Sequence, residues 1–289
     1  MPYARSDRAK LWYEVSGEGP PLVLIGGFAL VDRQFEFCDP YLRKHHTIIH
    51  WHYQGVGKSD WSMTAPYTLE GWVDDLRVVL DAAGIEKAAV WCTSTGAAIG
   101  TRFASKYPQR TSALITYPWV RSDAGWRDIF KASYEVARVF GIKQLSRLYA
   151  GVVLPPGLLY SKAGVAYEKW AKLRYEENVN ITTIKEVLGA YSAVDLTADV
   201  RGLRCPTMLL MGNESALNDK RDRMEAAAYD TLMREFRALK DDVEVTTIRG
   251  AGSTYCMITK PRECSEAVIR YLEKVRRTAT RRKTAQRRT

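Results

Sequence analysis

Short apolar runs alternate with segments of helical periodicity along most of this chain, and this alternation limits the folds open to it. Residues 21–27 are continuously apolar apart from their first position and end in a Gly pair, as a buried parallel strand would. Residues 68–85 repeat apolar positions at helical spacing, with Thr68 as the predicted N-cap. The alternation predicts an α/β fold with a mostly parallel, twisted sheet flanked by helices. Further strands are predicted at 11–17 (as an edge hairpin strand), 46–52, 87–93, 113–118, 206–212 and 244–250, and further helices at 94–108 and 261–275.

The character of the chain changes after Pro118. Residues 119–204 have mostly helical periodicity and are rich in aromatic side chains, and strand-like runs return after them. This order predicts a core made of residues 1–118 and 205–275, with residues 119–204 inserted as a helical cap.

The last fourteen residues, RRTATRRKTAQRRT (276–289), hold seven basic residues and no acidic one. They account for most of the formal net charge of +10, so the rest of the chain carries only +3. Because the segment has no apolar periodicity, we expect a disordered, solvated tail, with a weak anionic contact as the alternative. The body of the chain lacks the charge pattern of a nucleic-acid binder, and no specific nucleic-acid partner is expected.

Cysteine usage and hydropathy indicate the class of protein. The five cysteines are scattered and form no CxxC pair, which argues against a disulfide framework or a zinc site. No apolar run approaches the roughly 18 residues of a membrane span, and the N-terminus does not resemble a signal peptide. We therefore expect a cytoplasmic protein with reduced thiols. Neither a metal-ligand cluster nor a nucleotide-binding glycine motif is present, so no cofactor is expected, and a homodimer is left open.

Five segments carry more specific patterns. They are GPPLVLIGGF, WHYQGVGKSD, AVWCTSTGA, CPTMLLMGNES and IRGAGSTYCMITKPRECSEAVIRYL. In this order they resemble the α/β-hydrolase superfamily, in particular its esterase, epoxide-hydrolase and C–C-hydrolase branch, over the chain up to about residue 275. The resemblance implies the α/β-hydrolase fold, with a cap that covers the active site.

The stretch AVWCTSTGA is similar to the nucleophile-elbow segment of that superfamily, Gly-x-Ser-x-Gly. Cys92 stands at the first glycine, and Ser94 stands at the nucleophile. The elbow is a strained strand-to-helix turn that needs small neighbours, and a cysteine is a modest enlargement. The alternative is that Ser94 is an ordinary N-cap of the following helix. The resemblance also implies an oxyanion hole formed by the backbone N–H groups of Phe28 and Thr95, beside Gly27.

The general base of a serine hydrolase is missing from its usual place. A serine hydroxyl becomes nucleophilic when a histidine, oriented by a carboxylate, removes its proton. In the superfamily the order is Ser, then acid, then His, but this chain has Ser253 at the histidine position. All four histidines (His45, His46, His50 and His52) precede Ser94.

The acid is displaced as well. Ser215 stands where the resemblance places the carboxylate, and Glu214 lies one residue earlier. Asp123 follows the predicted 113–118 strand, where some members carry an alternative acid. Each carboxylate has the simpler interpretation of a solvated loop residue. The vacant positions 215 and 253 together indicate a degenerate catalytic triad.

A few other residues could contribute to the site. His52 ends a predicted strand at the same rim of the sheet and is the one histidine that we consider as a substitute catalytic group. Tyr255 follows the vacant histidine position, and Trp126 is one of the cap aromatics; both are candidates for the pocket, together with Gly27, Cys92, Asp123 and Glu214.

Three functional classes fit these observations. The first is a non-hydrolytic enzyme (elimination or another lyase reaction, isomerisation or cyclisation) that acts on a small hydrophobic carbonyl compound under the cap. The second is an inactive protein that keeps the pocket to bind a ligand or partner. The third is a serine hydrolase of esters or thioesters with an unusual base. The retained elbow serine and Gly-Gly loop favour the first class.

Overall fold

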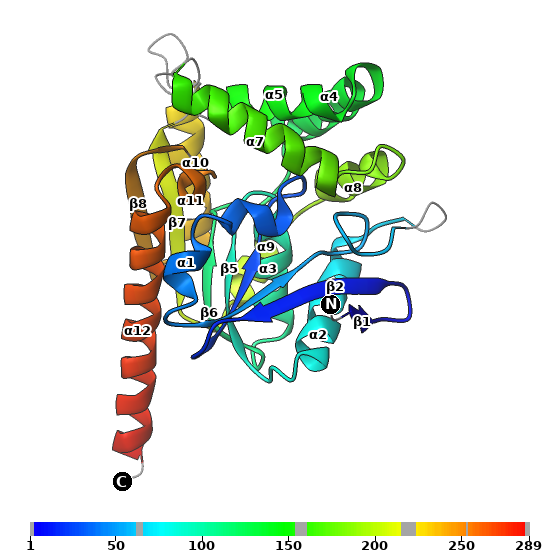
Figure 1. Cartoon of the computed structure of the whole chain (residues 1–289). Helices are drawn as coiled ribbons and strands as arrows, with labels where there is room; N and C mark the ends of the chain where they lie inside the picture. Colours follow the sequence, from blue (N-terminus) through cyan, green and yellow to red (C-terminus); the bar gives the residue numbers. More distant parts are fainter. Residues whose placement is uncertain (1–2, 62–65, 154–160, 215–223, 253, 287–289) are drawn as a thin grey trace.

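The computed structural model describes residues 3–61, 66–153, 161–214, 224–252 and 254–286. Its sheet has the strand order β1-β2-β4-β3-β5-β6-β7-β8, in which β1, β2 and β4 pair antiparallel and β4 to β8 pair parallel. The predicted α/β class with a mostly parallel sheet is therefore confirmed (Figure 1). The strands are β1 (Tyr3–Arg5), β2 (Lys10–Ser16), β3 (Pro21–Ile25), β4 (Thr47–Trp51), β5 (Ala88–Cys92), β6 (Thr111–Thr116), β7 (Thr207–Glu214) and β8 (Val243–Gly252).

The central strands are apolar on both faces because helices cover both sides of the sheet. In β3, Val23 and Ile25 belong to one buried cluster, while Leu22 and Leu24 belong to another. Such continuous apolar runs are typical of buried parallel strands. Helices α2 (Leu69–Ala82) and α3 (Gly96–Lys106) contribute to the first cluster, and α1 (Asp39–Leu42) and α12 (Pro261–Gln286) to the second. Three shorter or peripheral elements are the 3-10 turn η1 (Val31–Phe35), α10 (Met224–Leu239) and α11 (Cys256–Thr259).

A helical segment connects β6 to β7. We call α4 (Ala124–Phe140), α5 (Ile142–Val153), α7 (Lys162–Asn178) and α8 (Ile184–Ser192) the cap helices, and α9 (Thr197–Gly202) leads back into the sheet. The cap helices lie together over one end of the sheet (Figure 1). Asn178 joins them to the core, since its carbonyl accepts the Gly57 N–H at 2.8 Å and its side chain donates to the Leu30 carbonyl at 3.3 Å.

Two sequence-based expectations need correction. The strand predicted at 11–17 is not an edge strand, because β1 pairs with it, Tyr3 opposite Trp12. The segment predicted as disordered from residue 276 is helical as far as Gln286, since α12 continues through it. Arg, Lys, Gln and Ala are good helix formers, and they extend a helix that is already nucleated by packing.

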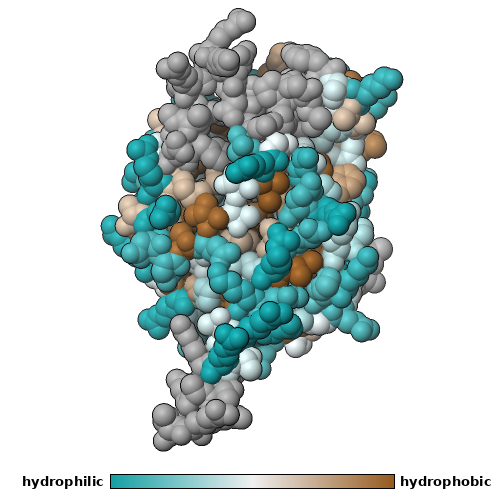
Figure 2. Space-filling view, turned by 90° about the vertical axis from the view of Figure 1, so that its left-hand side faces the viewer, coloured by the Kyte–Doolittle hydropathy of each residue, from teal (hydrophilic) through white to brown (hydrophobic). Residues whose placement is uncertain are grey.

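The face shown in Figure 2 is mostly hydrophilic, with its apolar residues in small separate patches.

His46, just before β4, makes the fold sensitive to acid. Its side chain is only 5% exposed, and burial, followed by the charges of His45 and Arg276, lowers its pKa from 6.5 to about 4. Below about pH 6.5 the His46 imidazole is protonated in the unfolded chain but stays neutral in the folded chain. The free energy of unfolding therefore falls as the pH drops toward 4. Over this pH range the free energy of unfolding of the native protein should fall by about 2 kcal/mol more than that of His46→Gln. Urea unfolding at pH 7 and pH 4.5 measures the difference. His45→Gln removes one of the charges that lower the pKa of His46 and leaves its burial intact, so it should keep most of this pH dependence. An equal pH dependence of the native protein and His46→Gln would contradict the assignment.

Candidate active site

Ser94 lies at a sharp turn between β5 and α3. Its φ is +52°, a left-handed conformation that costs energy for a residue with a side chain. The next glycine, Gly96, is in backbone contact with β3, because a Cβ atom there would lie 2.5 Å from the Ile25 carbonyl oxygen. Helix α3 begins at Gly96 with Thr95 as its N-cap, so Ser94 is not the capping residue. The strain and close packing fit a nucleophile elbow.

Cys92 fits into the turn because a glycine faces it. A Cβ atom at Gly100 would lie 2.7 Å from the Cys92 Cβ and would collide with its sulfur, so the missing side chain at 100 makes room for the cysteine. The Cys92 thiol is buried and contacts the Ile115 carbonyl at 3.5 Å, and burial raises its pKa to about 12. The contacts of Cys92 are thus those of a packing residue, and its place in the pocket stays a prediction.

The Gly-Gly loop after β3 lies directly against the elbow. A Cβ atom at Gly27 would stand 2.9 Å from the Ser94 Oγ, so only glycine leaves the serine hydroxyl its space. The Gln34 side chain holds the loop in place, accepting the Gly27 N–H at 2.6 Å and donating to the Thr254 carbonyl at 2.8 Å. Gln34 thus ties the glycine loop to the loop after β8. No motif or spacing in the sequence indicates this role of Gln34.

The Phe28 N–H, one half of the predicted oxyanion hole, is bonded to a side chain of the protein itself. The Phe28 N–H, predicted to face a ligand oxygen, donates a 2.8 Å hydrogen bond to the Thr95 Oγ1. Both residues are buried. Phe28 and Thr95 are therefore in contact, but the Phe28 N–H already has an acceptor, and the oxyanion hole stays a prediction.

His52 is committed to partners other than Ser94. Its Nε2 lies 2.8 Å from the Asp32 Oδ1, and its Nδ1 accepts the Lys58 N–H at 2.9 Å. An Nδ1 that accepts leaves the proton on Nε2, which donates to the carboxylate. Burial lowers the pKa of His52, and the imidazole also packs on the Trp12 ring at 4.4 Å. With both nitrogens bonded, His52 is built as a structural residue, which corrects the prediction of a catalytic one.

The remaining predicted site residues lie in different parts of the fold. Asp123 caps α4, accepting the Trp126 N–H at 3.0 Å, so a catalytic role for this exposed carboxylate is not supported. Trp126 packs against Trp119 in an aromatic cluster. Glu214 ends β7 and pairs with Gly252 at the end of β8, so the ends of these two strands lie side by side. Ser215 and Ser253 lie outside the described residues.

Tyr255 is buried under the cap helices. Its hydroxyl lies 3.5 Å from that of Tyr175, and its ring lies 6.0 Å from that of Tyr167, both on α7. Burial raises the pKa values of all three phenols, with Tyr167 and Tyr175 well above the usual range. At neutral pH these groups are therefore hydrogen-bond donors and not bases.

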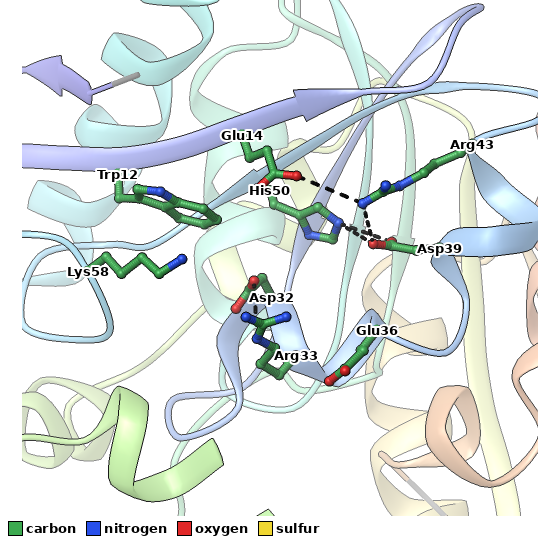
Figure 3. Close-up of a pocket in the computed structure, with 9 residues that line it drawn as sticks. All are labelled: Trp12, Glu14, Asp32, Arg33, Glu36, Asp39, Arg43, His50 and Lys58. Atoms are coloured by element: carbon green, nitrogen blue, oxygen red, sulfur yellow. Dashed lines mark hydrogen bonds and ion pairs between the residues drawn. The ribbon is translucent and has the colours of Figure 1, made fainter. Parts of the chain in front are cut away.

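A small polar pocket lies outside this region, beside Asp32 (Figure 3). Its volume is about 70 Å³, room for about two water molecules. The charged side chains mostly neutralise one another; the Arg43 guanidinium, for example, lies 3.0 Å from the Asp39 carboxylate. Among the described residues, no three His, Cys, Asp or Glu side chains are placed so that together they could hold a metal ion. The pocket is lined by Trp12, Glu14, Asp32, Arg33, Glu36, Asp39, Arg43, His50 and Lys58.

Comparison with known proteins identifies the fold. Residues 20–129 match the family model described as the α/β hydrolase fold. The structure of MGS-M2, an α/β-hydrolase enzyme from a deep-sea metagenome library, superimposes with a TM-score of 0.79 over 94% of this chain and 97% of that one, at 16% identity. Residues 20–129 therefore match the α/β-hydrolase family, and the chain as a whole has the fold of these structures. The enol-lactonase of Burkholderia xenovorans also superimposes, with a TM-score of 0.75 at 17% identity, over 94% of this chain and all of that one.

Two bacterial proteins are similar in sequence. RutD of Azorhizobium caulinodans, a putative carbamate hydrolase by name, is 28% identical over 75% of this chain and 82% of its own. The polyketide synthase ThaQ of Burkholderia thailandensis is 27% identical over 91% of this chain, which corresponds to 12% of that protein. Among the described residues, no helix is long and apolar enough to cross a membrane.

Proposed function

We propose that this protein is an enzyme of the α/β-hydrolase fold that binds the carbonyl group of a small hydrophobic compound at Ser94, beneath the cap helices. The reaction proceeds without an acyl-serine intermediate. One observation carries the proposal: the strained Ser94 turn is kept, while His52 has both ring nitrogens bonded elsewhere. Strain of this kind persists where function needs it.

The described groups around the site favour polarisation of a carbonyl. Ser94, the Phe28 N–H and the phenols near Tyr255 are donors, and no described imidazole is hydrogen-bonded to Ser94. Donors aimed at a carbonyl oxygen stabilise a developing enolate, whereas attack by serine needs a base. This pattern supports elimination, isomerisation or cyclisation, with the α-proton leaving to solvent. A cytoplasmic location and a homodimer remain predictions.

A side-by-side assay tests the reaction class. We would offer a β-hydroxy aryl ketone and phenyl acetate to the purified protein and follow the products by mass spectrometry. The proposal predicts turnover of the ketone to an enone or to cleavage fragments, with no acceleration of ester hydrolysis. Gly27→Val, whose side chain would occupy the space beside the Ser94 Oγ, should lower the ketone rate at least about tenfold. Gly189→Ala, in open space on α8, is the matched glycine control.

Hydrolysis is the second candidate, because the relative RutD is named for carbamate hydrolysis. Accelerated cleavage of phenyl acetate or a phenyl carbamate that disappears in Ser94→Ala would favour it. If neither class of compound is converted, the ligand-binding alternative gains support.

A further inference from the structure

The C-terminal end of α12 extends beyond the body of the protein. We call residues 276–286 the α12 extension, which is about three helical turns long. Tyr271 and Leu272 are the last buried side chains that the structure describes along the helix, and the described side chains from Arg276 to Arg281 are all exposed. Figure 1 shows the extension running past the sheet and the other helices toward the C-terminus. A partner can therefore approach it without meeting the rest of the chain.

The α12 extension is strongly basic. Its sequence, RRTATRRKTAQ, has five basic residues and no acidic one. A helix turns by about 100° per residue, so positions 276, 277, 281, 282 and 283 lie on all sides of its axis. The positive charge thus surrounds the helix and does not form a stripe along one face.

The charges next to the basic residues change along α12. In the part that packs on the core, basic residues have an acidic partner one turn away: Arg262 lies 2.8 Å and Arg270 lies 3.7 Å from Glu266. In the extension, Arg281 follows Arg277 by four positions, and like charges at this spacing destabilise a helix. A polyanion that neutralises these charges would relieve the repulsion.

The residue types of the α12 extension indicate which polyanion fits. Apart from two alanines, none of its residues is apolar. Protein interfaces centre on buried aromatic and other large side chains, and a helix that lies in a membrane surface has an apolar face. Since the extension offers neither, its charges must supply the binding. A bilayer meets a helix from one side, whereas the major groove of B-DNA, about 12 Å wide, places phosphates on both sides of a helix of about the same diameter.

We propose that the α12 extension binds double-stranded DNA through its phosphates, without reading the base sequence. Contacts of arginine and lysine with phosphate release counterions, and this electrostatic contribution does not depend on sequence. The body of the chain carries only +3 and lacks a nucleic-acid-binding pattern, so the extension supplies the contact by itself. The DNA contact is independent of the reaction at Ser94.

Fluorescence anisotropy with a fluorescein-labelled duplex of about 20 base pairs tests the contact on the full chain. Arg277→Gln/Arg281→Gln removes two charges from the extension and keeps good helix formers there. Arg262→Gln/Arg270→Gln is the matched control, because it removes two charges from the same helix where both side chains are 70% exposed. We expect the native protein to bind with a Kd below about 0.1 mM at about 50 mM KCl. The Kd should rise about five- to twentyfold in the extension variant and less than about twofold in the control.

The salt dependence of the Kd identifies phosphate contacts. Between about 50 and 200 mM KCl, the slope of log Kd against log salt should be smaller by about 2 in the extension variant than in the native protein. A second duplex of unrelated sequence should bind with the same Kd. Both variants should keep the native Tm, since none of the substituted side chains is buried.

Four results would overturn the assignment to DNA. An equal rise in Kd in the two variants would mean that the whole protein attracts DNA and the extension does not bind it. A preference above about tenfold for one duplex would mean that bases are read. Vesicles of phosphatidylcholine and phosphatidylserine that sediment with the native protein but not with the extension variant, together with no binding of the duplex, would assign the extension to a membrane surface. Binding of neither probe would leave a solvated helix without a polyanion partner.

Discussion

Gly96→Ala should lower the free energy of unfolding by about 3 kcal/mol, the upper end for overpacking a core. The new Cβ would lie 2.5 Å from the Ile25 carbonyl oxygen and would also collide with the carbonyl of Gly26. Both atoms belong to the backbone, so neither can rotate away as a flexible side chain would. Strand β3 and helix α3 must separate to admit the methyl group. Urea unfolding followed by circular dichroism measures the loss.

Gly189→Ala is the matched control for this substitution. Gly189 is an interior residue of α8, and a Cβ atom there would meet nothing within 4 Å. Alanine is the better helix former, so this variant should gain about 0.5–1 kcal/mol. Equal effects of the two substitutions would show that β3 and α3 are not in contact at the elbow.

His52→Leu should cost about 3 kcal/mol of unfolding free energy because it leaves the Asp32 carboxylate buried without its partner. The His52 Nε2 lies 2.8 Å from the Asp32 Oδ1, and the two residues are 1% and 8% exposed. Although burial by itself raises the pKa of Asp32, the hydrogen bond from His52, together with the nearby Arg33 guanidinium, brings it down from 3.8 to about 2. The folded chain therefore holds this carboxylate ionised, and its contribution to stability is present above pH 4 and is lost as the pH falls toward 2.

An exposed ion pair provides the comparison for His52→Leu. Glu135 and Arg138 on α4 lie 2.7 Å apart at the surface, and Glu135→Ala should change stability by less than about 0.5 kcal/mol. Chemical denaturation at pH 7 compares both variants with the native protein. A loss below 1 kcal/mol in His52→Leu would mean that His52 is not a structural residue and would reopen its assignment as a base.

The fold was predictable from sequence because it depends on local periodicity. The apolar run at 21–25 and the helical pattern after Thr68 are properties of neighbouring residues, and the Thr68 side chain does accept the Gly71 N–H as an N-cap. The elbow at Ser94 also follows from adjacent small residues. The extra pairing strand β1 was missed because a run of three residues carries too little pattern to be detected.

The polar details of the site were not predictable because they join residues far apart in the chain. His52 meets Asp32, and the Thr95 hydroxyl meets the amide of Phe28, which lies 67 positions earlier. Neither pairing is marked in the sequence by a characteristic spacing or a motif. The packing of Cys92 against Gly100 was easier to predict, because residues eight positions apart on the two sides of the elbow can face one another. Gly100 is a second small residue on α3, after Gly96. Its presence could have indicated that α3 makes room for Cys92, which replaces the first glycine of the motif.

Labelling by a fluorophosphonate is the most direct test of the central claim that Ser94 occupies an elbow without an activating base. The folded, monodisperse protein would be incubated with the probe and its intact mass measured, with Ser94→Ala as the control and a known serine esterase treated in parallel. The account predicts no covalent adduct on the native protein under conditions that label the esterase completely. Stoichiometric labelling that disappears in Ser94→Ala would show that some group activates the serine, and the non-hydrolytic assignment would be wrong.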